Sequence, residues 1–300
     1  MADQQDIARI ADLGLGINIS PSWARRDLPG SNGKPVDLKD IEQVACPSAG
    51  SCGGQFTANT MACISEAIGL ALTNSAMPPA TNTEERKKYG ESSGKAVMNL
   101  IEKNIRPRDI VTLDSLVNAA RVVAATGGST NAALHLPAIA NEAGIKFSLS
   151  DVVDIYRNTP YIGDMAPGGK YVAKDLYDVG GVPIVIKSLL DGGYINGDCI
   201  TSTGKTIGEN HKNVIFPNNQ NVVYKSENPI SKNSSVVGLW GNLAENGCIS
   251  KIAGLNNLKF IGKAKCFDCE EDALSAVLKN EIVAGDAVII RYEGPIGGPG

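Results

Sequence analysis

The sequence contains few of the residues that most often mark catalytic sites. It has two histidines in 300 residues, and aromatic residues make up 5% of the chain. Neither His135 nor His211 has a cysteine or aspartate partner at the spacing of a catalytic triad, so we expect core or surface roles for both. The sequence also lacks a run of about eighteen apolar residues, so we expect no transmembrane helix and no membrane partner.

The chain has little excess charge of either sign. Its 28 lysines and arginines stand against 32 aspartates and glutamates, which gives a formal net charge of −4. A nucleic-acid partner is therefore not expected, because binding to phosphates needs a basic surface. The first residues, Met-Ala-Asp-Gln-Gln-Asp-Ile, lack both the pattern of a secretory signal and that of a transit peptide. This favours a cytoplasmic location.

The seven cysteines do not resemble the framework of a small secreted protein, since they are odd in number and widely spread. Free thiols in a reducing compartment are expected, and some of them are available as metal ligands. Cys266 and Cys269 have Cys-x-x-Cys spacing, but no second pair accompanies them, which argues against a zinc or redox site. A P-loop before Lys205 is excluded, because the pattern requires glycine where Cys199 stands.

The strongest local signal is the loop Cys46-Pro-Ser-Ala-Gly-Ser-Cys-Gly-Gly54, which precedes a helix expected over residues 57–72 with Thr57 as its N-cap. A cysteine at the start of a helix lies near unpaired N–H groups and the positive end of the helix dipole. These features stabilise a thiolate, the form that binds metals. A buried free cysteine beside a tight turn explains the same pattern equally well.

A second signal is the loop Thr126-Gly-Gly-Ser-Thr-Asn131, which precedes a helix expected to end at Gly144. Glycines followed by hydroxyl residues at a helix start can hold a carboxylate or phosphate through backbone N–H groups. Simple N-capping by Ser129 or Thr130 explains this pattern as well, and on the residues alone it is the better explanation.

The remaining pattern predicts a helix-rich α/β domain followed by a smaller β-rich domain. Residues 73–95 are polar and indicate a surface excursion. Helices are expected over residues 94–103, 113–125, 151–157 (capped by Ser150), 184–191 and 270–279, and after about residue 37. Strands are expected over residues 236–240, 249–253, 260–267 and 287–292.

Taken together, these pieces resemble the dihydroxy-acid and 6-phosphogluconate dehydratase family. The Cys46–Met61 segment is similar to the third iron–sulfur cysteine motif of the dihydroxy-acid dehydratases, and the order and spacing of further motifs agree from about residue 37 to the end. These motifs are Gly127–Asn131 with Leu134–Leu136, Gly180–Pro183, Gly197–Cys199, Thr203–Thr206, Gly241–Gly247, Arg291–Pro295 and Gly297–Gly300.

The resemblance implies a layered α/β domain over residues 37–230 and part of a small β-barrel-like domain over residues 231–300, after a divergent segment 1–36. It implies a homodimeric hydro-lyase that uses an iron–sulfur cluster, of the 2Fe-2S or 4Fe-4S type, and Mg²⁺. Its substrate would be a 2,3-dihydroxy acid and its product a 2-keto acid precursor of valine or isoleucine. By this resemblance Cys52 is a cluster ligand, while Ser129, Thr130 and Asn131 bind substrate.

The resemblance also implies what this chain does not contain. Family members are about twice as long, and the motifs that supply two further cluster cysteines and the Mg²⁺ ligands are absent from these 300 residues. The catalytic base, a serine, is expected beyond Gly300. We therefore expect the isolated chain to be inactive. Two alternatives are a sugar-acid or 6-phosphogluconate dehydratase, and a non-catalytic fragment that only oligomerises.

Overall fold

The computed structural model describes residues 52–255 and 258–293 of the chain. These residues fall into two units, the larger ending at Leu255 and the smaller containing residues 258–293. The segment 1–36, the helix expected after residue 37 and Cys46 lie outside the described residues. No helix of the described residues is long and apolar enough to span a bilayer.

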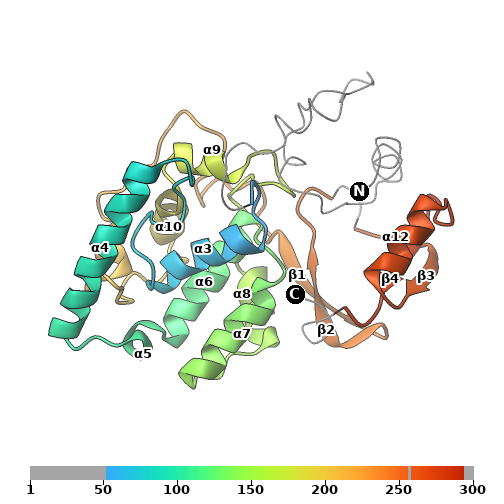
Figure 1. Ribbon diagram of the computed structural model, residues 1–300, viewed down its shortest axis with the longest axis horizontal. Coiled ribbons are helices and arrows are strands. Elements are labelled where there is room, and N and C mark those ends of the chain that lie inside the picture. Colours follow the sequence, from blue (N-terminus) through green and yellow to red (C-terminus); the bar gives the residue numbers. More distant parts are fainter. Residues whose placement is uncertain (1–51, 256–257, 294–300) are drawn as a thin grey trace. The chain divides into compact units, whose positions relative to one another are not determined.

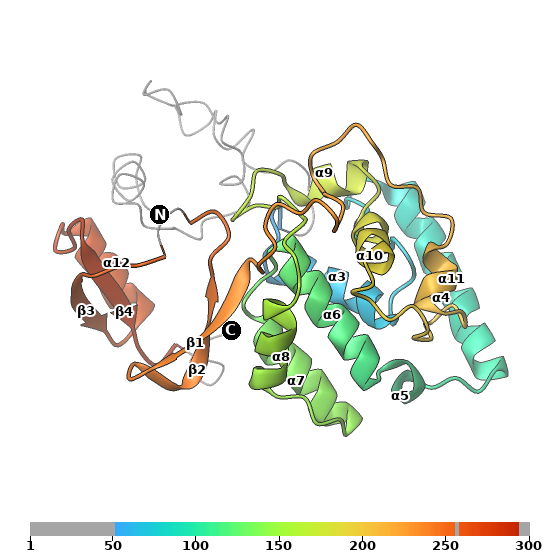
Figure 2. The ribbon, with the colours of Figure 1, turned by 180° about the vertical axis from the view of Figure 1, so that it is seen from behind.

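The larger unit consists mainly of helices, which Figures 1 and 2 show from opposite sides. They are α3 (Thr57–Ile68), α4 (Thr83–Glu102), α5 (Pro107–Ile110), α6 (Leu113–Thr126), α7 (Ala132–Ala143), α8 (Leu149–Arg157), α9 (Ala173–Asp178), α10 (Val182–Asp191) and α11 (Ile207–His211). The helix expected to end before Gly144 is confirmed, and Gly144 adopts the left-handed conformation that ends it.

The core of this unit forms where α3 packs against α6. Ile64 and Ile68 of α3 are each 1% exposed, and Leu116 of α6 is completely buried. Alanines on α6 are also fully buried, among them Ala120 and Ala124. Their small side chains let neighbouring helices approach closely, so α3 and α6 are closely packed.

Two helix starts differ from the sequence-based expectation. Phe56, not Thr57, occupies the N-cap of α3, and the Thr57 side chain instead bonds to another loop. Ser148, not Ser150, caps α8, since its hydroxyl accepts a hydrogen bond from the N–H of Asp151. For Thr57 the difference arises because its hydroxyl has partners in another loop.

The end of α3 also comes earlier than expected. The helix stops at Ile68 because Gly69 takes a φ of 97°, and its N–H bonds to the carbonyl of Glu66. A side chain at position 69 would come within 3.0 Å of the Ile200 carbonyl oxygen. The chain therefore turns at this glycine rather than continuing to Leu72.

The polar segment 73–95 does not form an irregular excursion throughout, because α4 begins at Thr83 and runs for 20 residues. Asn82 caps it by accepting from the Glu85 N–H, and Glu84 and Glu85 complement the dipole of its first turn. No residue of α4 is buried. Hydrophobic periodicity, which reports burial, therefore gave no signal for the first half of this helix.

The strands form two small sheets. In the larger unit, β1 (Val236–Gly241) pairs antiparallel with β2 (Ala244–Lys251), and β1 packs against α8. In the smaller unit, β3 (Lys263–Phe267) pairs parallel with β4 (Asp286–Ile290) beside α12 (Glu270–Leu278). Among the described residues these strands close no barrel. The layered α/β and β-barrel-like domains, with a boundary near residue 230, stay a prediction.

Candidate functional site

The loop that carries Cys52 is fixed from within α3. The side-chain amide of Asn59 donates to the carbonyl oxygens of Cys52 and Gly54, at 2.5 and 2.7 Å. Asn59 is 2% exposed, so both bonds are shielded from water. Cys52 itself is half-buried and is a free thiol. The structure thus places an accessible cysteine at the start of a rigid helix, as expected.

A second segment supports the same loop from the other side. The Gln55 N–H donates to the Ala166 carbonyl at 2.6 Å, and the Ala173 N–H donates to the Gly53 carbonyl at 2.5 Å. A side chain at Gly54 would come within 2.9 Å of the Ala166 oxygen, so only glycine fits there. The two glycines after Cys52 therefore serve close backbone contact with residues 166–173.

The second predicted loop lies directly beside the first. The hydroxyls of Thr57 and Ser129 are 3.1 Å apart, and the amide of Asn131 donates to the Thr57 hydroxyl at 2.7 Å. The Ser129 N–H donates to the hydroxyl of Thr60. The starts of α3 and α7 therefore meet at Thr57 and Thr60, in the segment that follows the Cys52 loop.

The second loop is less open to anions than its glycines indicate. The N–H groups of Gly128, Ser129 and Asn131 already donate, to the Val123 carbonyl, the Thr60 hydroxyl and the Ser129 hydroxyl respectively. These backbone donors bind the protein itself. Substrate binding by Ser129, Thr130 and Asn131 stays a prediction that depends on their side chains.

The environment distinguishes Cys63 from Cys52. Cys63 is 1% exposed, and burial raises the pKa of its thiol to about 12, although the Gln55 amide at 3.4 Å has the opposite effect. Such a thiol stays protonated at neutral pH and is a poor metal ligand. Within residues 52–255 and 258–293, no group of three or more His, Cys, Asp or Glu side chains is placed to hold a metal ion.

Sequence reasoning missed several polar residues that build this site. Gln55, Asn59 and Thr126 are almost completely buried, and Gln55 joins α3 to α6 by donating to the Thr126 hydroxyl at 3.2 Å. Its side-chain oxygen is buried and has no hydrogen-bond partner in the described part of the chain. The polar run Gln-Phe-Thr-Ala-Asn-Thr at a helix start was the available signal.

One of the two histidines, His211, is buried and takes no part in these contacts. His211 is 2% exposed at the end of α11, and its Nδ1 lies 2.7 Å from the Ile207 carbonyl oxygen. Burial lowers the pKa of His211. The core role expected for a lone histidine is confirmed here.

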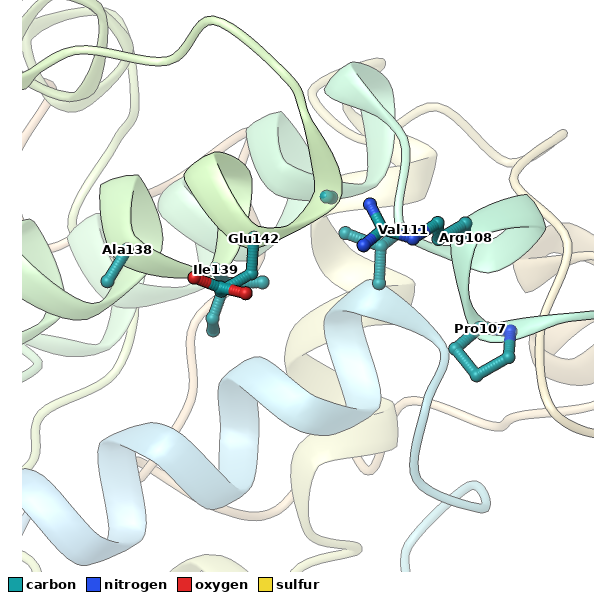
Figure 3. A pocket seen from close by; sticks show the side chains of 7 residues that line it. Pro107, Arg108, Val111, Ala138, Ile139 and Glu142 are labelled. Atoms are coloured by element: carbon teal, nitrogen blue, oxygen red, sulfur yellow. The ribbon is translucent and has the colours of Figure 1, made fainter.

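A separate pocket lies between α5 and α7, where Ala138, Ile139 and Glu142 face Pro107 and Arg108 (Figure 3). Its lining is mainly apolar. It contains none of the predicted site residues, so the candidate site is defined by the two loops and not by this pocket.

Comparison with known proteins identifies the family of this chain. Residues 24–210 match the dihydroxy-acid/6-phosphogluconate dehydratase N-terminal domain, and residues 221–300 match the C-terminal domain of the same family. A dihydroxy-acid dehydratase of Pelagibacter ubique is 64% identical over 264 residues, which are 88% of this chain and 46% of that protein. Dihydroxy-acid dehydratase 2 of Bradyrhizobium diazoefficiens is 60% identical over the same share of each chain.

The chain spans about half the length of the curated relatives that it matches. A more distant relative, the dihydroxy-acid dehydratase of Sulfolobus acidocaldarius, is 49% identical over 88% of this chain and 47% of its own length. These relatives do not favour the alternative of a sugar-acid dehydratase. The chain belongs to the dihydroxy-acid/6-phosphogluconate dehydratase family of hydro-lyases.

Proposed function

We propose that this chain is part of a dehydratase that converts 2,3-dihydroxy-3-methyl carboxylic acids to 2-keto acids, the precursors of valine and isoleucine. The observation that carries the proposal is the contact between the Cys52 loop and the Ser129–Asn131 loop, through the paired hydroxyls of Thr57 and Ser129. The names of the relatives support the substrate class. We further propose that the protein is cytoplasmic and forms a homodimer.

The residues present fit one ligand of an iron–sulfur cluster, whether 2Fe-2S or 4Fe-4S. Cys52 is half-buried at a helix start, and its backbone is held by Asn59, so its thiol is well placed to bind iron as a thiolate. Such clusters take several cysteine ligands. We expect the other ligands, and those of Mg²⁺, outside the described residues, in which no group of three or more His, Cys, Asp or Glu side chains is placed to hold a metal ion.

The proposed reaction removes the C2 proton and the C3 hydroxyl of the substrate, and the resulting enol becomes the 2-keto acid. An iron held by Cys52 would supply Lewis acidity toward the departing hydroxyl. The chain's own part is to position: Asn59 fixes the Cys52 backbone, and the side chains of Ser129, Thr130 and Asn131 bind the substrate's oxygens. That a serine takes the C2 proton stays a prediction.

A chimeric enzyme tests this proposal. The matched 264 residues of the Pelagibacter ubique relative are replaced by those of this chain, and formation of 2-keto acid from 2,3-dihydroxy-3-methylbutanoate is measured. We expect activity in the chimera and its loss in the Cys52→Ala variant. Cys248→Ala, which changes an exposed cysteine of β2, is the matched control and should stay active.

A substrate panel separates the alternatives. The chimera should act on branched 2,3-dihydroxy acids in preference to sugar acids and 6-phosphogluconate. A folded chimera that prefers a sugar acid would contradict the proposed substrate class. A folded chimera without any dehydratase activity would contradict the proposal that this chain can serve the reaction.

A further inference from the structure

Helix α7 is apolar on its outer face as well as on its inner face. It contacts α3, α6 and α8, and its buried residues are Ala132, Ala133, Leu136 and Ala140. On the outer face Leu134 is 41% exposed, Ala138 is exposed, and Glu142 is the only charged residue of the helix. A surface helix of a soluble protein normally has a polar outer face, whereas a helix that is apolar all round is covered by other protein.

This outer face forms one wall of the groove in Figure 3. Ala138, Ile139 and Ala143 line the groove from α7, and Pro107 and Val111 line it from the side of α5. The groove is open to solvent and has a volume of about 420 Å³. The two alanines are small, so an element that faces α7 can approach its backbone closely. The groove is therefore shaped to accept apolar side chains of another element.

The two walls carry opposite charges. Arg108 lines the groove on the α5 side and Glu142 lines it on the α7 side. Both residues are exposed, and neither takes part in an ion pair within the described residues. The apolar floor is thus bordered by one cation and one anion, and each is free to pair with a charge on a partner.

This pattern of charge is complementary to itself. A two-fold axis that passes through the groove, normal to the surface, exchanges the two walls, so that the same patch contributes to both sides of the contact. Arg108 of each copy then faces Glu142 of the other, and both charges are paired at once. A partner or ligand with charge of one sign would pair with only one wall. The charges therefore favour a second copy of this chain as the occupant.

We propose that this groove is an interface between two copies of the chain, with Ala138 and Ile139 at its centre and an Arg108–Glu142 pair on each side. A stable dimer buries about 800 Å² of each copy, so we expect the contact to extend along α7 to the exposed Leu134. The inference rests on the homodimer of the proposed function, for which it names the surface, and it does not depend on the reaction.

Reversal of the charges tests the two-fold pairing. Sedimentation velocity of the 300-residue chain over a series of protein concentrations gives the dissociation constant of the dimer. Arg108→Glu and Glu142→Arg each make both paired contacts repulsive, so each variant alone should raise this constant at least about tenfold. An equimolar mixture of the two variants should dimerise again, because opposite charges meet at both contacts. Glu91→Arg, an exposed change on α4, should leave the constant unchanged.

Ala138→Glu tests the apolar floor. Position 138 is exposed on a helix and glutamate is a good helix former, so this variant should stay folded, as circular dichroism will show. It should be monomeric, because it places two carboxylates at the centre of the contact. A folded wild-type chain that stays monomeric would overturn the proposal, and so would a dimer that Ala138→Glu leaves intact. Variants that do not pair when mixed would overturn it as well.

The same variants in the chimera with the Pelagibacter ubique relative show which occupant covers the groove in a chain of full length. We expect the same order of dissociation constants there. A chimera whose oligomeric state none of the variants changes would overturn the proposal and leave the rest of the chain, or a small apolar ligand, as the occupant. A chimera that dimerises through this groove but forms no 2-keto acid would contradict the proposed reaction alone.

Discussion

At the scale of single residues, the environment decides which cysteine can do chemistry. Cys52 lies in the loop before α3 and Cys63 lies within this helix. The Asn59 amide donates to the Cys52 carbonyl, and the Gln55 amide donates to the Cys63 sulfur. Cys63 packs into the core at 1% exposure, while Cys52 remains half-buried with its backbone held in place. Reactivity therefore follows burial and not the presence of a cysteine in the motif.

Alkylation measures this difference directly. Because burial raises the pKa of Cys63 to about 12, iodoacetamide at pH 8 should leave Cys63 unmodified in the folded chain, whereas Cys52 should react. Peptide mapping by mass spectrometry resolves the two. In denaturant both should be labelled. Equal labelling of Cys63 with and without denaturant would contradict the buried position.

A second effect at the scale of single residues is the protonation of the buried Glu66 side chain, which makes stability depend on pH. Its carboxylate is 3% exposed and accepts from the Asn74 and Ala76 N–H groups at 2.7 and 2.9 Å. Burial still raises the pKa of Glu66 from 4.5 to about 7. The folded state therefore binds more protons than the unfolded state in this range. The stabilising effect of the buried acid is complete below pH 4.5 and is lost as the pH rises through 7.

We accordingly predict that the difference in free energy of unfolding between the wild-type chain and Glu66→Gln depends on pH. The free energy of unfolding of the wild-type chain should fall between pH 4.5 and 7 relative to Glu66→Gln, which cannot ionise. Glu91→Gln, an exposed change on α4, should track the wild type throughout. Chemical denaturation at a series of pH values measures the free energy of unfolding of each chain. A constant difference between wild type and Glu66→Gln would refute the assigned protonation.

At the scale of elements, the packing of α3 on α6 positions the site. Ile68 belongs to the buried stripe of α3 that the sequence pattern predicts, and it is 1% exposed. Truncation there leaves a cavity that the close-packed helices cannot fill.

Ile68→Ala should therefore lower the free energy of unfolding by roughly 2–5 kcal/mol. Val97→Ala, at a position of α4 that is 54% exposed, should change it by less than about 0.5 kcal/mol. Urea denaturation gives both values. A loss well below about 1 kcal/mol in Ile68→Ala would contradict the assigned core.

A further prediction concerns the hydrogen bonds that join the starts of α3 and α7. Thr57→Val keeps the shape of the side chain but removes the hydroxyl that accepts from the Asn131 amide and pairs with the Ser129 hydroxyl. The expected loss is about 1–3 kcal/mol. Ser93→Ala removes an exposed side-chain bond on α4 and should cost much less. If Thr57→Val matched Ser93→Ala in stability, the two loops would not be joined as described.

Whether a helix of this chain is predictable from the sequence depends on whether it buries a stripe of apolar residues. Helices with a buried stripe, such as α3 and α6, were predictable because periodic apolar residues report burial. The first half of α4 was not, because this helix buries no residue and is defined by its cap at Asn82. For the site, the cysteine loop and the second loop were visible as motifs. Their meeting through Thr57 was not, because it depends on tertiary contacts.

At the scale of the whole molecule, the chain belongs to a family whose matched relatives are about twice its length. Among its described residues Cys52 is the thiol that we propose as a cluster ligand, and no group of three or more His, Cys, Asp or Glu side chains there is placed to hold a metal ion. We therefore propose the activity for the full-length family chain, with Cys52 as the cluster ligand proposed among the described residues.

The most direct test of this account measures iron and acid-labile sulfide in the chimera with the Pelagibacter ubique relative after anaerobic reconstitution. We predict that the chimera and its Cys248→Ala variant retain equal amounts of both, whereas Cys52→Ala loses most of them while remaining folded. A folded Cys52→Ala chimera that keeps the full amount of iron and sulfide would contradict the assignment of Cys52 as a ligand.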